Sequence, residues 1–172
     1  MTPPAFQIRP CVASDADVLA TLVRELADFE KLPDLARATS DDFRSHLFGP
    51  RPVAEALLAE VGGEGVGFAL FFPTFSTFRG QPGLYLEDLF VRPGDRGRGI
   101  GKALIASVAR RAVERGCGRL EWAVLNWNAP AIAFYQAAGA MPLDDWTGYR
   151  IADEPLVSLA GLAPEKQGDR PG

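Results

Sequence analysis

Apolar residues recur every three or four positions in two long segments of the chain, Val18–Phe29 and Ile100–Val113. This period predicts two amphipathic helices, each with one face packed against a core. Ser14 and Asp17 stand at the spacing of a capping box, which predicts that the first helix begins there. Gly116 follows the second segment, and a glycine at this place is typical of a helix end.

Shorter and denser apolar runs lie around these two segments. Because they are bounded by turn residues, they predict strands rather than helices. Glycines between the second and third run predict a tight hairpin turn there. The runs are Phe6–Pro10, Ala54–Val61, Gly65–Phe72, Leu84–Val91, Arg119–Leu125 and Gly148–Ile151.

The order of the predicted elements defines a fold class. A short helix is expected to start at Thr39 and another to run from Pro130 to Ala138. Together with the strands they predict an α/β (α+β) fold with a mixed sheet, antiparallel at the N-terminal part and parallel in a C-terminal β-α-β part, with helices on both faces. We expect residues 1–163 to form one domain. The polar, Gly- and Pro-rich residues 164–172 are expected to be a disordered tail.

The composition of the chain limits the kinds of molecule that it is expected to bind. The chain has 172 residues, a formal net charge of −4 and a pI near 5.1, which argues against nucleic acid and suits a cationic or neutral substrate. No apolar run approaches the roughly 20 residues that span a bilayer, so we expect no membrane partner. Cys11 and Cys117 form no CxxC motif, which predicts reduced thiols in a cytoplasmic protein. We expect no metal, and a surface or core role for His46, the single histidine.

A glycine-rich turn between a predicted strand and a predicted helix is the first candidate for chemistry. Glycines let a backbone approach a ligand closely, and the unpaired amides of a helix start attract anions. One interpretation is therefore a phosphate cradle, and the other is a surface turn that binds nothing. The spacing excludes both the GxxxxGK[ST] and the GxGxxG cradles. The three glycines and the basic residues around them are Gly97, Gly99, Gly101, Arg96, Arg98 and Lys102.

Two motifs together resemble a known family. RGRGIG, residues 96–101, is similar to the R/Q-x-x-G-x-G/A signature of the GNAT N-acetyltransferase superfamily. NWNAPAIAFYQAAGA, residues 126–140, is similar to the second signature of that superfamily. YLEDLFV, WNAPAIAFYQAAGA and RELADFEKLPD look closest to its diamine (spermidine/spermine) acetyltransferase group. The resemblance covers residues 6–151 and implies a GNAT-like fold with acetyl transfer to a primary amine of a small molecule.

The resemblance also implies acetyl-CoA as the cosubstrate. Its pyrophosphate would lie on the turn, and its pantetheine arm would pair with the backbone of the preceding strand. Asn128 matches an asparagine that touches this arm, although it could equally be a helix N-cap. The residues implied for acetyl-CoA binding are Leu89, Phe90, Val91, Arg96, Gly97, Arg98, Gly99, Ile100, Gly101, Lys102, Asn128 and Tyr135.

Amine acetylation needs one group that removes a proton from the ammonium and another that protonates the leaving thiolate. By resemblance, Tyr135 is the general acid, and the alternative for it is an ordinary core aromatic. Glu87 matches the group that removes the proton, and a buried ion pair is its alternative. Asp88 is expected on the opposite strand face from Glu87, where it could bind a second substrate charge or be structural.

The acceptor amine is the open part of the interpretation. Phe29, Glu30 and Asp34 match residues that contact the polyamine in the diamine group, and such a set suits an ammonium. The stretch FFPTFSTFRG departs from that group, because Ser76 stands where an acidic residue is expected. A lysine-like amino acid such as thialysine is therefore an equal candidate, with Arg79 meeting its carboxylate. Antibiotics, protein amines and a non-catalytic acyl-CoA-binding role are further alternatives, and the resemblance suggests a homodimer.

Overall fold

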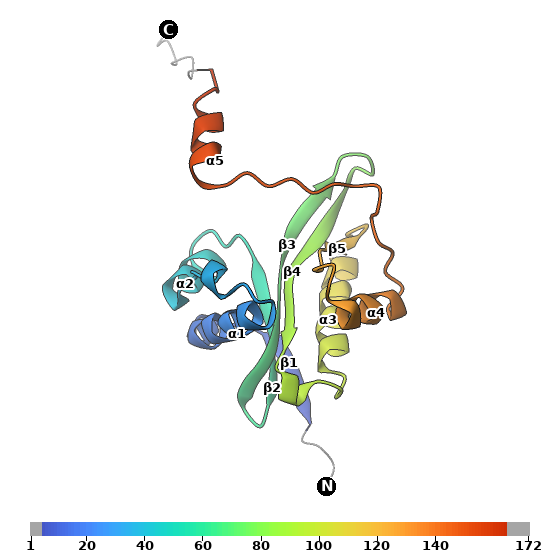
Figure 1. Ribbon diagram of the computed structural model, residues 1–172. Helices are drawn as coiled ribbons and strands as arrows, with labels where there is room; N and C mark the ends of the chain where they lie inside the picture. Colours follow the sequence, from blue (N-terminus) through green and yellow to red (C-terminus); the bar gives the residue numbers. More distant parts are fainter. Residues whose placement is uncertain (1–4, 165–172) are drawn as a thin grey trace. The chain divides into compact units, whose positions relative to one another are not determined.

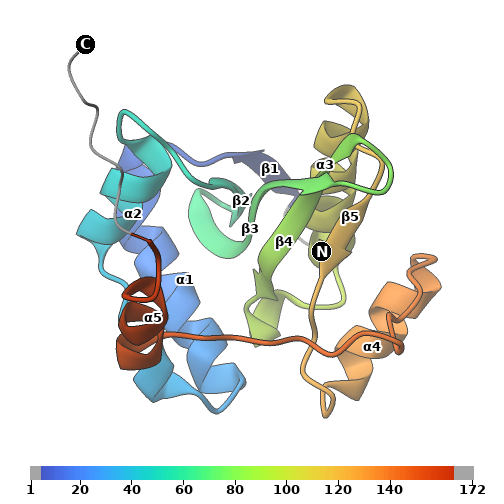
Figure 2. The ribbon, with the colours of Figure 1, turned by 90° about the horizontal axis from the view of Figure 1, so that it is seen from above.

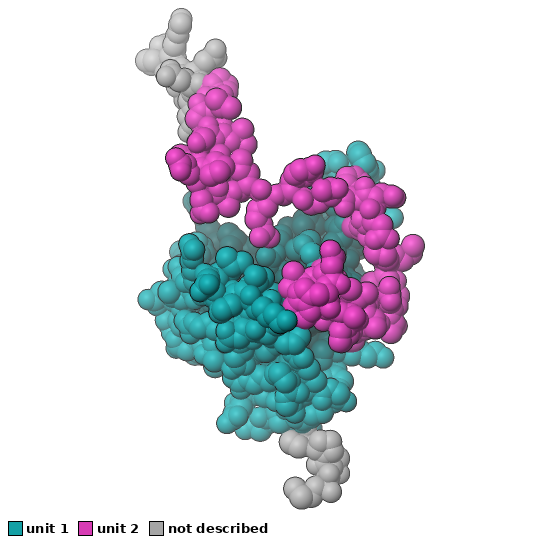
Figure 3. Space-filling model, in the orientation of Figure 1, with its two compact units in different colours: residues 1–123 teal, residues 124–172 magenta. Residues whose placement is uncertain are grey.

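The structure is a computed structural model that describes residues 5–164. The chain divides into two compact units, Met1–Ala123 and Val124–Gly172 (Figure 3). The boundary falls inside the segment that we predicted to be one domain, residues 1–163, so that prediction stays open. The predicted tail lies outside the described residues, apart from residue 164. No helix within residues 5–164 has the length and hydrophobicity needed to cross a bilayer.

A five-stranded mixed sheet forms the centre of the first unit (Figure 1). The strands follow one another in chain order, the first four antiparallel and the last pair parallel. The mixed sheet and its two halves are thus as predicted. The strands are β1 (Phe6–Pro10), β2 (Glu55–Val61), β3 (Glu64–Ser76), β4 (Gln81–Val91) and β5 (Leu120–Trp122).

Helices cover both faces of this sheet, as predicted. Figure 2 shows α1 (Ala16–Phe29) and α2 (Ser40–Phe48) on one side and α3 (Ile100–Glu114) on the other. Short 3-10 turns occupy Ala13–Asp15, Pro33–Leu35 and Pro93–Asp95.

The apolar positions that predicted these helices form two cores. Leu19 and Leu22 of α1 are buried in one cluster with Phe68 and Phe90 of the sheet. Phe71 lies an odd number of residues from Phe68, and strand alternation turns it to the opposite face. On that face α3 contacts β3 and β4 and buries its own apolar residues, Ile100, Leu104 and Val108.

The first helix begins differently from the prediction. Ser14 lies inside the 3-10 turn, and α1 starts one residue after Asp15. The capping box of Ser14 and Asp17 is therefore wrong, and Asp17 pairs instead with Arg44 of α2 at 2.8 Å. The second helix does begin as predicted, because Thr39 caps it and accepts a hydrogen bond from the amide of residue 42.

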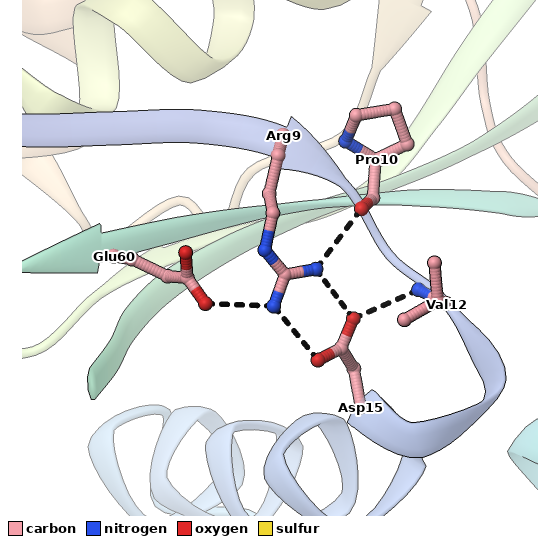
Figure 4. Close-up of polar contacts among 5 residues, drawn as sticks. All are labelled: Arg9, Pro10, Val12, Asp15 and Glu60. Carbon is pink, nitrogen blue, oxygen red and sulfur yellow. Dashed lines mark hydrogen bonds and ion pairs between the residues drawn. The ribbon is translucent and has the colours of Figure 1, made fainter. Parts of the chain in front are cut away.

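Asp15 has a larger structural role than a cap (Figure 4). Its buried carboxylate accepts two hydrogen bonds from the Arg9 guanidinium, at 2.7 and 2.9 Å, and one from the Val12 amide at 2.8 Å. Arg9 also donates to Glu60 at 2.6 Å. The guanidinium holds the pKa of Asp15 below its ordinary value. This cluster fixes β1, β2 and the start of α1 to one another.

The second unit contains α4 (Ala129–Ala137) and α5 (Asp153–Ala160). The helix predicted from residue 130 is confirmed as α4, and Gly139 follows it with a φ of 88°. The strand predicted at residues 148–151 is wrong, since that segment has no regular structure and α5 follows it. The strand predicted over residues 119–125 is confirmed only for the three residues of β5.

Candidate active site

The glycine turn connects β4 to α3 and needs glycine for its backbone shape. Gly97 and Gly99 have φ angles of 77° and 83°, in the left-handed region that L side chains rarely adopt. Gly99 is the N-cap of α3, and no side chain caps the helix there. The N-cap residue therefore leaves the first amides of α3 uncapped at a positively polarised helix start. A Cβ at either glycine would meet nothing within 4 Å, so the turn is open to a ligand. These features fit an anion such as a pyrophosphate.

The basic side chains of the turn differ in what they do. Arg98 forms an ion pair with Asp95 within the turn. The Nε of Arg96 donates to the backbone oxygen of Val91 at 2.9 Å. Lys102 is exposed in the first turn of α3. Both arginines therefore make contacts within the chain, Arg96 from an exposed position, and a role of the three basic residues in anion binding stays a prediction.

The sheet opens beside this turn. The parallel ladder between β4 and β5 covers only Leu84–Leu86 on the β4 side. Leu89, Phe90 and Val91 pair with β3 on one edge and lie beyond the ladder with β5 on the other. This is the arrangement that the resemblance implied for pantetheine binding, because an extended ligand can pair with a strand edge that lacks a neighbouring strand.

A β-bulge interrupts β4 one residue past the end of that ladder. Leu70 pairs with Asp88 and Phe71 with Leu86, so the register skips Glu87. A bulged residue breaks the alternation of side chains between the two faces. The sequence predicted that Glu87 and Asp88 lie on opposite faces of the sheet, because side chains alternate along an unbroken strand. The bulge interrupts the strand at Glu87, so this alternation no longer supports the prediction. Glu87 is also exposed, which rules out the buried ion pair considered for it, while Asp88 is half-buried.

Three carboxylates come together near the bulge. Burial is the main cause that raises the pKa of Asp88 to about 7, and the charges of Glu87 and Glu30 raise it further. Burial likewise raises the pKa of Glu30, the C-cap residue directly after α1. Asp88 and Glu30 thus favour their protonated forms more than an exposed acid does. A cationic ligand bound beside them would stabilise their ionised forms and lower both pKa values. Asp34 is exposed in the following 3-10 turn and is not among the groups that raise the pKa of Asp88.

Two of the predicted acceptor residues contact other groups of the first unit. The ring of Phe29 holds the guanidinium of Arg96, whose central carbon lies 4.4 Å from the ring centroid. Arg79 lies in the hairpin turn before β4 and donates to the backbone oxygen of Gly118 at 3.1 Å. The advance along β4 from residue 81 to residue 88 spans about 23 Å at about 3.3 Å per residue. The structure therefore does not bring Arg79 to the carboxylates of its own chain.

The remaining predicted site residues lie in the second unit. Tyr135 is half-buried on α4, with its ring 5.3 Å from that of Phe134 in an edge-to-face arrangement. Asn128 is the N-cap of α4, and its Oδ1 accepts a hydrogen bond from the Ala131 amide at 3.3 Å. The structural interpretation of Asn128 is thus confirmed, and a contact with acetyl-CoA remains a prediction. His46 is exposed on α2.

Comparison with known proteins identifies the family. A sequence profile described as the Acetyltransferase (GNAT) family matches residues 20–140. Thialysine N-epsilon-acetyltransferase of Bos taurus is 37% identical over 165 residues, covering 90% of this chain and 96% of that protein. Spermidine/spermine N(1)-acetyltransferase-like protein 1 of Homo sapiens is 32% identical over 165 residues, covering 90% of this chain and 24% of that longer protein.

A solved structure shares the fold of this chain. An integron cassette protein from the mobile metagenome of V. cholerae superposes with a TM-score of 0.76 and 26% identity, covering 90% of this chain and 97% of that one. The chain belongs to the GNAT acetyltransferase family and has the GNAT fold. It is an N-acetyltransferase, a family whose members use acetyl-CoA as the cosubstrate.

Proposed function

We propose that this enzyme transfers an acetyl group from acetyl-CoA to the terminal amine of a lysine-like amino acid. The observation that carries the proposal is the group of carboxylates at the β4 bulge, with a pKa of about 7 at Asp88. An ammonium suits this group because its positive charge offsets the unfavourable free energy of ionised carboxylates in a half-buried site. The names of relatives such as thialysine N-epsilon-acetyltransferase support the same class of acceptor.

The cosubstrate would be held by the first unit. The amides at the start of α3 and the side chain of Lys102 suit the pyrophosphate, and the edge of β4 at Leu89–Val91 suits the pantetheine arm. Bound there, acetyl-CoA supplies the activated acetyl thioester.

The chain's own residues would then handle two protons. Only a free amine attacks a thioester, so a base must take a proton from the ammonium. The resemblance implies Glu87 for this step, and the raised pKa of Asp88 makes Asp88 the better base near neutral pH. Glu87 would add negative charge that favours proton uptake. Tyr135 stays our candidate for the acid that protonates the leaving thiolate, since a phenol of pKa about 10 suits that task.

A diamine is the second candidate acceptor. It is favoured by the distance between Arg79 and the carboxylates, because the residue proposed to bind a substrate carboxylate is not near them within one chain. Three acids without that arginine suit a molecule with two positive charges.

We also propose that the enzyme is a homodimer in the cytoplasm. The resemblance to the diamine acetyltransferase group supports the dimer, as do large exposed apolar side chains of the second unit. Both cysteines are free thiols, which supports a reducing compartment. Light scattering on the full chain would test the dimer. The exposed apolar side chains of the second unit that support the dimer include Met141, Leu143, Trp146 and Tyr149.

A panel of amines tests the acceptor. Release of the CoA thiol would be followed with thialysine, ornithine, putrescine and spermidine, and the proposal expects the highest kcat/KM for thialysine or ornithine. Glu30→Gln should raise the KM of the amine more than it lowers kcat, because Glu30 would bind a charge that does not react. Higher kcat/KM for putrescine or spermidine would support the diamine instead. No turnover with any of the four would reject both acceptor classes.

A further inference from the structure

Two arginines connect the cosubstrate turn to the end of α1. Arg92, directly after β4, forms a two-point ion pair with Glu25 of α1 through contacts of 2.8 Å. Four residues further along the chain, the guanidinium of Arg96 lies 4.4 Å from the centroid of the Phe29 ring, which is one helical turn after Glu25 in α1, and 5.9 Å from that of Phe90. The start of the glycine turn and the last turn of α1 are therefore in direct contact.

The Arg96 side chain is fixed in this place from two sides. Its Nε donates to the backbone oxygen of Val91 at 2.9 Å, while its central carbon lies over the Phe29 ring. A guanidinium over an aromatic ring gains a cation–π interaction, and its orientation is set by the hydrogen bond. The ring of Phe29 is followed directly by Glu30, one of the three carboxylates near the bulge. The contact with Arg96 therefore lies one residue from Glu30.

We propose that Arg96 is a positioning residue that couples the cosubstrate turn to the amine site, with the Phe29 ring holding Arg96 rather than the substrate ammonium. This inference rests on the proposed acetyl transfer to an amine. If so, different groups of the turn act on different substrates. The backbone amides and Lys102 serve acetyl-CoA, while Arg96 serves the acceptor through the end of α1.

The first test separates the two substrates kinetically. Arg96→Gln keeps a residue that the signature of the turn allows but removes the guanidinium from the ring. It should raise the KM of thialysine about threefold to tenfold and leave the KM of acetyl-CoA within about twofold. Lys102→Gln is the matched control in the same turn and should show the opposite split. A rise confined to acetyl-CoA, or equal rises for both substrates, in Arg96→Gln would overturn the proposal.

The aromatic partner provides an independent variant. Phe29→Leu removes the ring and should reproduce the effect of Arg96→Gln, whereas Phe29→Tyr keeps the ring and should restore a normal KM for the amine. The double variant of Arg96→Gln with Phe29→Leu should be no worse than either single change, because both remove one contact. Additive effects of the two changes would contradict a shared contact.

Hydrogen exchange tests the coupling without any amine. CoA added alone should slow amide exchange in peptides that cover residues 26–32 of the wild-type protein, and this protection should be lost in Arg96→Gln. Equal protection in both proteins would overturn the coupling. If the wild type acetylates none of the four amines, the proposed acceptor fails, and the exchange experiment still decides the role of Arg96.

Discussion

Replacing Asp88 with asparagine should make the folded protein more stable at high pH. The pKa of Asp88 is raised in the folded state to about 7 from an ordinary 3.8, so folding favours its protonated form. Its favourable contribution is complete below the unfolded pKa and is lost as the pH rises through 7. Between about pH 5 and pH 8 the wild type should therefore lose up to about 2.5 kcal/mol through this group, while asparagine loses nothing.

Urea unfolding followed by tryptophan fluorescence measures this difference. The gap in unfolding free energy between Asp88→Asn and the wild type should widen in favour of the variant from pH 5 to pH 8. Asp28→Asn, which removes an exposed carboxylate from α1, corrects for the general effect of deleting one negative charge. A gap that stays constant across this range would refute the raised pKa of Asp88 and with it the proposed base.

Two further changes test the cosubstrate turn and the general acid. Gly99→Val should weaken CoA binding at least tenfold by calorimetry, because the backbone of a valine is strained at the positive φ of this N-cap. The control Gly94→Val should bind CoA normally, because position 94 has open space and no positive φ. Unchanged CoA affinity in Gly99→Val would contradict the assignment of the glycine turn as a pyrophosphate cradle. Tyr135→Phe should lower kcat about 10²- to 10⁴-fold with little change in the KM of acetyl-CoA, and the exposed Tyr149→Phe should do neither. Near-normal turnover would return Tyr135 to a core role.

The sheet, the two amphipathic helices and the glycine turn were predictable because each depends on local periodicity or local backbone freedom. Leu19 and Leu22 reached the core as their spacing indicated. Gly97 and Gly99 took the positive φ angles that only glycine adopts readily. For such features the sequence carries the physical cause directly.

The bulge at Glu87 was not predictable, because a bulge depends on the register between two strands rather than on either strand alone. The same limit explains Asp88, whose pKa depends on burial and on Glu30, 58 positions earlier in the chain. Ser14 failed as a cap because the Arg9 cluster places Asp15 at the helix start. The contact between Arg96 and Phe29 gave no sequence signal, since neither residue lies in the motif of the other.

The pH dependence of kcat/KM for thialysine tests the central claim most directly, namely that a carboxylate at the β4 bulge takes the proton from the acceptor. Two ionisations should control the wild type: Asp88, which must be deprotonated to take the proton, near pH 7, and the ammonium, which must still carry that proton, near about 10.4. The logarithm of kcat/KM should rise with a slope of about one below pH 7 and should level off between pH 7 and about 10. Asp88→Asn should show a single slope of about one throughout. A wild-type profile without the break, or a variant that keeps it, would contradict the account.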